Sequence, residues 1–254
     1  MSKFAILLLT ASGAFAEHAI APPQLGFIAD QARVLRPVYG MAGSFILGPA
    51  MRAGVLNQAF SGSLGLLKTD SLLAAFNAQG ASLGAIDASR GAAIFAFSPD
   101  GTTALAYVAS SNALYEWKDG AFSRNWFHPV EGAVRAIAFP TPSAATLIVE
   151  RTVDDLWAVR VPLAGLGMLS ESALTGVHTP VLALPSGDLV YATGGAMAIR
   201  HASGVESRIP ASLPASFSLQ QMNRDWVELR DDQASTRFGL RVTPSREGIY
   251  RLPE

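Results

Sequence analysis

The chain has 254 residues, with 19 Lys and Arg against 20 Asp and Glu, so its formal net charge is −1. Half of the residues are hydrophobic and 15% are charged, which excludes an intrinsically disordered chain. Because no basic field exists to attract phosphate groups, we expect no binding to nucleic acid or to an anionic membrane surface.

The first sixteen residues have the pattern of a secretory signal peptide. Lys3 precedes an apolar run from Phe4 to Ala11, and Ala14-Phe15-Ala16 is a small-residue cleavage site. A buried N-terminal strand or helix is the alternative. We therefore expect residues 1–16 to be removed, leaving a domain of residues 17–254 that is periplasmic or extracellular. The sequence contains no cysteine, so its stability has to come from packing, and the mature chain has no apolar run of transmembrane length.

Two short apolar runs, residues 25–29 and 34–38, predict a β-hairpin joined through Asp30-Gln31-Ala32. A similar hairpin is predicted at residues 114–126, where Lys118-Asp119-Gly120 forms the turn. We interpret both hairpins as the outer strand pair of a repeating unit. Residues 44–47 predict a further short strand.

A repeat of about forty residues follows. An apolar run ends in a turn and resumes as a second run, and the recurring position is occupied by Phe60, Phe97, Phe139, Leu184 and Met222, at intervals of 37, 42, 45 and 38 residues. This period is typical of four-stranded propeller blades. The predicted units span residues 53–91, 92–132, 133–175, 176–213 and 214–254.

These units, together with the hairpin at residues 25–39, predict an all-β fold. We expect a single β-propeller of five or six four-stranded antiparallel blades, with the ring closed by strands from both termini. Specifically, the hairpin at residues 25–39 is expected to pair with strands from residues 214–254, which would remove exposed sheet edges.

The clearest turn, Phe97-Ser98-Pro99-Asp100-Gly101, resembles the F-S-P-D-G turn of secreted bacterial β-propeller repeat proteins. At the level of architecture the chain is also similar to WD-repeat-like and YVTN-type propellers, although it has no Gly-His or Trp-Asp dipeptide. The resemblance covers most of residues 25–254. It implies a propeller whose termini share a blade, and it implies no particular activity.

Motifs of catalysis or metal binding lack the context that they need. Residues 80–84 match G-x-S-x-G, but Ser82 lies between predicted strands with no helix behind it, so we expect no catalytic serine. The four histidines form no compact metal-binding spacing. We therefore expect no catalytic residues, no metal and no cofactor.

Polar residues in the connections between units are the candidate ligand-binding residues, since such loops gather on one face of a propeller. They are Arg90, His128, Glu131, Arg135 and His178. An ordinary solvated rim is the alternative interpretation. The leading hypothesis is an exported, monomeric, non-catalytic propeller that binds a protein or a small ligand. The rival is a propeller enzyme, a hydrolase or lyase, with its site at the channel mouth.

Overall fold

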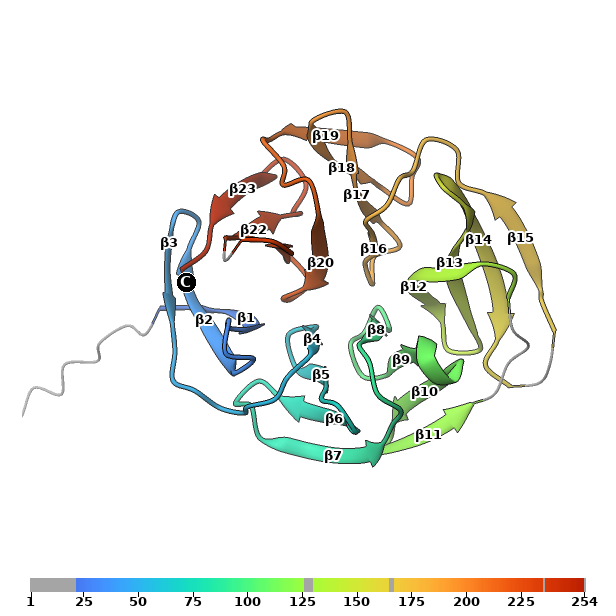
Figure 1. Cartoon of the computed structure of the whole chain (residues 1–254), viewed down its shortest axis with the longest axis horizontal. Coiled ribbons are helices and arrows are strands. Elements are labelled where there is room, and N and C mark those ends of the chain that lie inside the picture. Colours follow the sequence, from blue (N-terminus) through green and yellow to red (C-terminus); the bar gives the residue numbers. More distant parts are fainter. Residues whose placement is uncertain (1–21, 126–129, 165–166, 235, 254) are drawn as a thin grey trace, which may run out of the picture.

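The computed structural model describes residues 22–125, 130–164, 167–234 and 236–253. In these ranges, β-strands form six antiparallel sheets around a central axis, and helical structure is limited to one 3₁₀ turn at Ala109–Ser111 (Figure 1). The protein is thus a six-bladed β-propeller, which confirms the all-β prediction and decides between five and six blades. Among the described residues no helix is long and apolar enough to cross a bilayer.

The six blades follow one another in chain order. Blade 1 contains β1 (Gln24–Ala29), β2 (Leu35–Met41) and β3 (Ser44–Leu47). Blade 2 contains β4 (Asn57–Phe60), β5 (Leu64–Lys68), β6 (Leu72–Asn77) and β7 (Ser82–Asp87). Blade 3 contains β8 (Ala93–Phe97), β9 (Ala104–Val108), β10 (Ala113–Lys118) and β11 (Ala121–Asn125). Blade 4 contains β12 (Ala133–Thr141), β13 (Ala144–Thr152), β14 (Asp155–Pro162) and β15 (Ser170–Ala173). Blade 5 contains β16 (Val181–Ala183), β17 (Leu189–Thr193), β18 (Ala196–Arg200) and β19 (Glu206–Pro210). Blade 6 contains β20 (Phe217–Gln221), β21 (Trp226–Asp231), β22 (Arg237–Arg241) and β23 (Gly248–Arg251).

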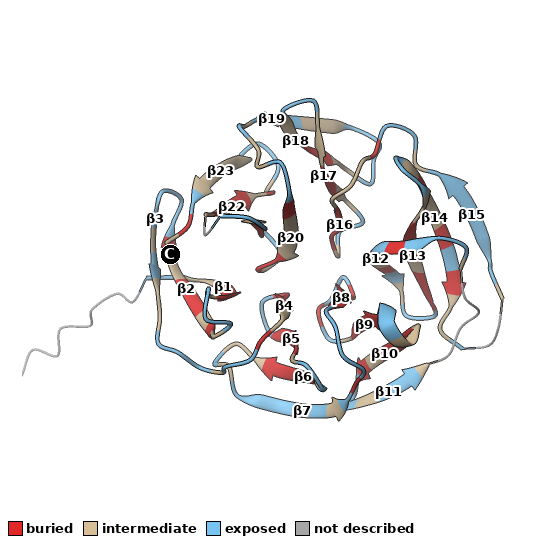
Figure 2. Cartoon of the chain, viewed as in Figure 1, coloured by how far each residue is buried: buried red, intermediate tan, exposed pale blue. Residues whose placement is uncertain are grey.

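Burial follows the position of a strand within its blade (Figure 2). The second strands β5 and β9 are buried at every residue, whereas the outer strands β7 and β15 are largely exposed. The reason is that each blade is covered on both faces by its neighbours, except at the rim. Each of six clusters of buried apolar side chains fills one interface between adjacent blades.

The F-S-P-D-G turn stabilises itself through side-chain hydrogen bonds. The Ser98 hydroxyl donates to an Asp100 carboxylate oxygen (2.5 Å) and accepts from the Thr103 N–H (3.0 Å), while the Thr102 N–H donates to Asp100 (3.1 Å). These bonds, with Ser98 first, hold the pKa of Asp100 below its usual value. Gly101 takes a φ of +73°, which a side chain would disfavour. The sequence motif is therefore a requirement of turn geometry.

The order of the strands assigns each loop to one of two faces. In an antiparallel blade the connection to the next blade and the turn between the second and third strands lie on the same side. We call this side the inter-blade face. The two other hairpins of each blade, including the F-S-P-D-G turn, lie on the opposite side, the hairpin face.

Blade 1 has an unusual position for its first strand. Leu25, at the start of β1, accepts a hydrogen bond from the Asn223 side chain (2.6 Å) on the hairpin face. The Arg33 carbonyl, beyond the end of β1, accepts from the Val55 N–H (2.9 Å), in the connection that leads into β4 on the inter-blade face. Hence β1 runs opposite to the innermost strands of the other blades and occupies the second position. The described part of blade 1 contains no innermost strand.

Among the described residues, five innermost strands surround the channel. The backbone N–H of Gln58 on β4 donates to the side-chain oxygen of Gln220 on β20 (3.4 Å). Blades 2 and 6 are therefore in direct contact on the channel side of blade 1. A channel cavity of about 220 Å³ is lined by residues of β4, β8, β12, β16 and β20 and by Arg230 of β21. Figure 1 shows β1 farther from the axis than β4 and β20.

Strands from both ends of the described chain close the ring, but the predicted pairing between them is wrong. β1 pairs with β2, and β20–β23 form a separate sheet. The two blades instead pack face to face through Ile28, Val38, Met222, Trp226 and Leu252. The hairpin at residues 25–39 also lies one position farther inward than an outer pair, because β3 covers it.

A buried polar cluster, which we call the polar seam, lies where blades 1, 2 and 6 meet. It comprises the buried residues Gln58, Glu228 and Arg237 and the half-buried Gln220. The Gln58 amide donates to the Phe27 carbonyl (3.5 Å) and to Glu228 (3.3 Å), and Arg237 donates to the other Glu228 oxygen (2.8 Å). Glu228 and Arg237 are 1% and 5% exposed. Burial raises the pKa of Glu228, although Arg237 and Arg230 act in the opposite direction.

Candidate functional site

A cleft of about 1140 Å³ lies on the inter-blade face between blades 4, 5 and 6. Three groups of loop residues form it. They are residues 178–181 before β16, residues 192–195 at the β17–β18 turn, and residues 211–219 leading into β20, with Arg135 and Asp154 of blade 4 at the edge. We call this depression the inter-blade cleft.

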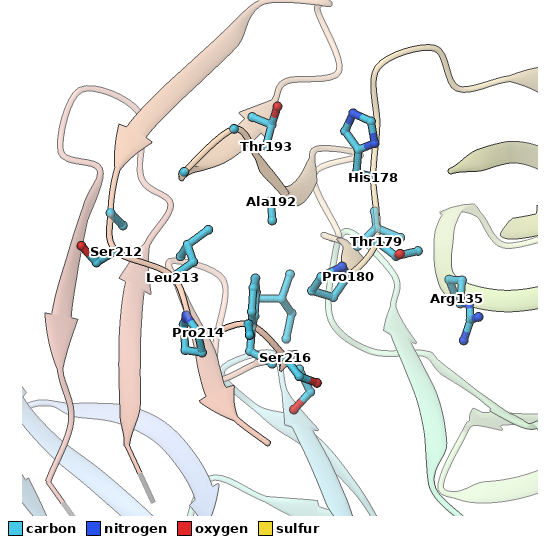
Figure 3. Close-up of a pocket in the computed structure, with 18 of the residues that line it drawn as sticks. Arg135, His178, Thr179, Pro180, Ala192, Thr193, Ser212, Leu213, Pro214 and Ser216 are labelled. Atoms are coloured by element: carbon cyan, nitrogen blue, oxygen red, sulfur yellow. The ribbon is translucent and has the colours of Figure 1, made fainter. Parts of the chain in front are cut away.

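Apolar and hydroxyl side chains alternate around the inter-blade cleft (Figure 3). Leu213 and Pro214 line one side and Pro180 lies across from them, while Thr193 and Ser212 contribute hydroxyl groups to the lining. Two consecutive glycines, 194 and 195, form the β17–β18 turn with positive φ, so the backbone itself lines part of the wall. Such a surface suits apolar contact combined with a few hydrogen bonds.

His178 and Asp154 form the charged corner of the cleft. The His178 Nδ1 lies 3.2 Å from an Asp154 carboxylate oxygen, and both side chains are about half exposed. Asp154 stands at the tight β13–β14 turn, with a φ of +62°. Its neighbour Asp155 turns away and accepts from the Trp157 indole N–H (2.9 Å). The two adjacent carboxylates thus serve different partners, as expected for neighbours in a turn.

Arg135 lies on β12 rather than in a loop, where the sequence had placed it. Its Nε donates to Glu150 on β13 (2.7 Å), and its side chain is 49% exposed. In Figure 3 Arg135 stands apart from the other labelled residues, beyond Thr179 and Pro180. It also borders the channel cavity, so it lies between the cleft and the channel mouth.

The structure brings together only part of the predicted set. Arg135 and His178 line the same cleft. Glu131 lines a separate hollow of about 170 Å³ with Arg151, and Arg90 is exposed in the connection between blades 2 and 3. His128 lies outside the described residues.

The sequence analysis missed the residues that form most of the cleft. The segment Ala211-Ser212-Leu213-Pro214 carries no titratable side chain, so it gave no chemical signal. Its Pro and Ser content indicates only a loop. The cleft arises from the shape of three converging loops, which a linear motif does not record.

Ser82 starts β7, the exposed outer strand of blade 2, after a turn in which Gly80 has positive φ. The strand–turn–strand setting predicted for it is thus confirmed, and it lies far along the chain from the residues of the cleft. Across the ranges that the structure describes, no three His, Asp or Glu side chains are grouped closely enough to hold a metal ion.

Comparison with known proteins identifies proteins of the same fold but assigns the chain to no family. No protein-family model matches the chain, and no curated protein matches it. Among solved structures, a chain of the nidogen/laminin complex aligns with a TM-score of 0.60 at 10% identity, covering 89% of this chain and 92% of that one. TolB from Acinetobacter baumannii aligns with a TM-score of 0.55 at 14% identity, over 90% of this chain and 66% of that one.

A protein of unknown function from Bacteroides caccae also aligns, with a TM-score of 0.54 at 14% identity over 92% of this chain and 100% of that one. At such low identity these likenesses establish a β-propeller and no activity. The propeller architecture inferred from the repeat is confirmed, whereas the F-S-P-D-G repeat type is not assigned to a family.

Proposed function

We propose that this protein is an exported, non-catalytic binding module that holds a partner over the inter-blade face. The inter-blade cleft carries the proposal. Its volume of about 1140 Å³ lies above the roughly 300–1,000 Å³ of ordinary small-molecule pockets. It is also built from loops on rigid sheets, which is where recognition surfaces usually lie. A protein segment or a bulky ligand fits such a cleft better than a small metabolite.

The test of this function compares binding by the intact protein with binding by a cleft variant. Affinity capture from the cells that produce the protein, under cross-linking, first supplies the partner. We expect the double variant Arg135→Ala/His178→Ala to bind that partner at least tenfold more weakly, as measured by isothermal titration calorimetry. Both replaced side chains are about half exposed, and a surface contact of this kind is worth about 0–1 kcal/mol, so the melting temperature changes little.

The matched control is Arg208→Ala/His201→Ala. Arg208 also pairs with a carboxylate, that of Glu206 (2.8 Å), and the His201 ring contacts Asp188 (3.3 Å), but both residues border the β18–β19 hairpin on the hairpin face. Normal binding by the cleft variant together with lost binding by the control variant would assign the partner to the opposite face.

A hydrolase is the second candidate, and one observation favours it. Asp154 engages the His178 ring at 3.2 Å, as an orienting carboxylate does in a catalytic dyad, and several hydroxyl side chains line the same cleft. The binding function predicts that a fluorophosphonate probe labels neither these serines nor Ser82, which mass spectrometry can check. Stoichiometric labelling of Ser212, Ser216 or Ser218 that disappears in His178→Ala would establish the enzyme instead.

Export rests on the pattern of residues 1–16, which lie outside the described structure. We expect the protein recovered from native cells to begin at or near Glu17, because Ala14-Phe15-Ala16 supplies the cleavage site. N-terminal sequencing of the recovered protein tests this expectation. An intact Lys3 in most molecules would contradict it.

A further inference from the structure

A second cavity, of about 420 Å³, opens on the inter-blade face directly above the polar seam. The β1–β2 turn, the connection before β4 and the β21–β22 hairpin form it. We call it the seam cavity. It lies beside blade 1, between the turn that follows β1 and the β21–β22 hairpin of blade 6.

The carboxylates that line the seam cavity already have partners. Asp30 accepts from the Arg36 guanidinium (2.7 Å) and from a backbone N–H, and these bonds lower its pKa although burial alone would raise it. Asp231 accepts from the N–H groups of the loop that follows it (2.8 and 3.0 Å). Asp232 accepts from the Ser216 hydroxyl (2.8 Å). Each carboxylate of the seam cavity therefore already accepts at least one hydrogen bond from within the protein.

The arginines of the seam cavity, by contrast, retain N–H groups for which no described residue is the acceptor. Arg237 is 95% buried and uses only Nη1, toward Glu228. Arg230 is partly buried, and Arg33 is exposed. Within the described residues neither of these two side chains forms a hydrogen bond or an ion pair. A guanidinium group only donates hydrogen bonds, from N–H groups that lie in one plane. A carboxylate matches this geometry, because its two oxygens can accept two parallel hydrogen bonds.

We propose that the seam cavity binds a small organic carboxylate, whose two oxygens accept hydrogen bonds from Arg230 and Arg237. The volume of about 420 Å³ lies within the range of small-molecule sites. Ala29, Val55 and Leu56 supply apolar wall for the remainder of the ligand. The neighbouring carboxylates limit the positive field of the three arginines, so a monoanion fits the cavity better than a phosphate dianion. This inference is independent of the partner proposed for the inter-blade cleft.

Calorimetric titration of the full chain with three probes tests the proposal. The probes are N-acetyl-alanine, its uncharged amide N-acetyl-alaninamide, and inorganic phosphate. We expect the acid to bind at least tenfold more tightly than the amide, and phosphate to bind more weakly than the acid. The proposal would be overturned if acid and amide bound equally, or if phosphate bound more tightly than the acid. It would also be overturned if the acid showed no binding up to about 10 mM, roughly ten times the concentration that half-saturates a weak site with a Kd of about 1 mM.

Two variants locate the site. Arg230→Gln removes the half-buried guanidinium and should weaken binding of the acid at least tenfold. Arg246→Gln makes the same charge change in the β22–β23 hairpin, on the opposite face of the same blade, and should leave binding unchanged. Amide shifts of Leu56 and Gln233 on addition of the acid provide a second measurement, which does not depend on any variant. Unchanged binding in Arg230→Gln, or shifts confined to other loops, would contradict the assignment.

Discussion

Replacement of Arg237 by leucine is expected to lower the free energy of unfolding by about 3–5 kcal/mol at neutral pH, the usual cost of breaking a buried ion pair from one side. The change leaves the Glu228 carboxylate buried with only the Gln58 amide as a direct partner, at 3.3 Å. Chemical denaturation measured by circular dichroism gives the value. The control Arg246→Leu, at an exposed hairpin position, should change stability by no more than about 0.5 kcal/mol.

The loss should depend on pH in a defined direction. Burial raises the pKa of Glu228 above its usual value of 4.5, so the folded protein takes up this proton more readily than the unfolded chain. A raised folded-state pKa gives stability that is present at low pH and is lost as the pH rises through that pKa. Arg237 opposes this rise, so its removal raises the pKa of Glu228 further, and the deficit of Arg237→Leu should shrink as the pH is lowered below neutral. A deficit that grows on acidification would show that Glu228 is ionised and satisfied without Arg237.

The double variant Glu228→Leu/Arg237→Leu separates charge from packing. Because it removes both buried charges, it should be more stable than Arg237→Leu alone. If the double variant is less stable than Arg237→Leu, the Glu228 side chain stabilises the fold through contacts other than its ion pair with Arg237.

Alanine at Gly26 is expected to destabilise the ring by about 2–4 kcal/mol, combining a strained backbone with a steric clash. Gly26 has a φ of +136°, and a Cβ atom there would lie 2.0 Å from the Met222 carbonyl oxygen of blade 6. The backbones of the first and last blades are thus in contact at this point, so the substitution forces them apart. Thermal and denaturant unfolding measure the effect.

Gly43 is the matched control for Gly26. It also belongs to blade 1 and has positive φ, +86°, but a Cβ atom there would meet nothing within 4 Å. Gly43→Ala should therefore cost only about 1 kcal/mol, for the backbone alone. Equal losses at the two positions would mean that contact between blades 1 and 6 does not stabilise the ring.

The sequence was sufficient to predict the blades because their signals are local. The repeat interval and the turn residues placed all five predicted units on blades 2 to 6, and Ser98, Asp100 and Gly101 form the turn that their types indicate. Local pairing between consecutive strands then determines each sheet.

The seam could not be predicted, since it depends on contacts between residues far apart in the chain. Val227-Glu228-Leu229-Arg230 alternates apolar and polar residues, which is the usual pattern of a strand with one solvated face. In the structure that polar face meets Gln58, 170 positions away in the chain, and is buried. The inter-blade cleft escaped prediction for a similar reason, because its loops carry few titratable groups and converge only in the folded ring.

A photo-crosslinking amino acid placed at one of two serines, in the cells that make the protein, tests the binding face most directly. Ser212 lies in the inter-blade cleft, and Ser203 lies in the β18–β19 hairpin on the opposite face; both are exposed. We predict a discrete cross-linked adduct from position 212 and none from position 203. An adduct from position 203 alone would contradict the proposal that the inter-blade face binds the partner.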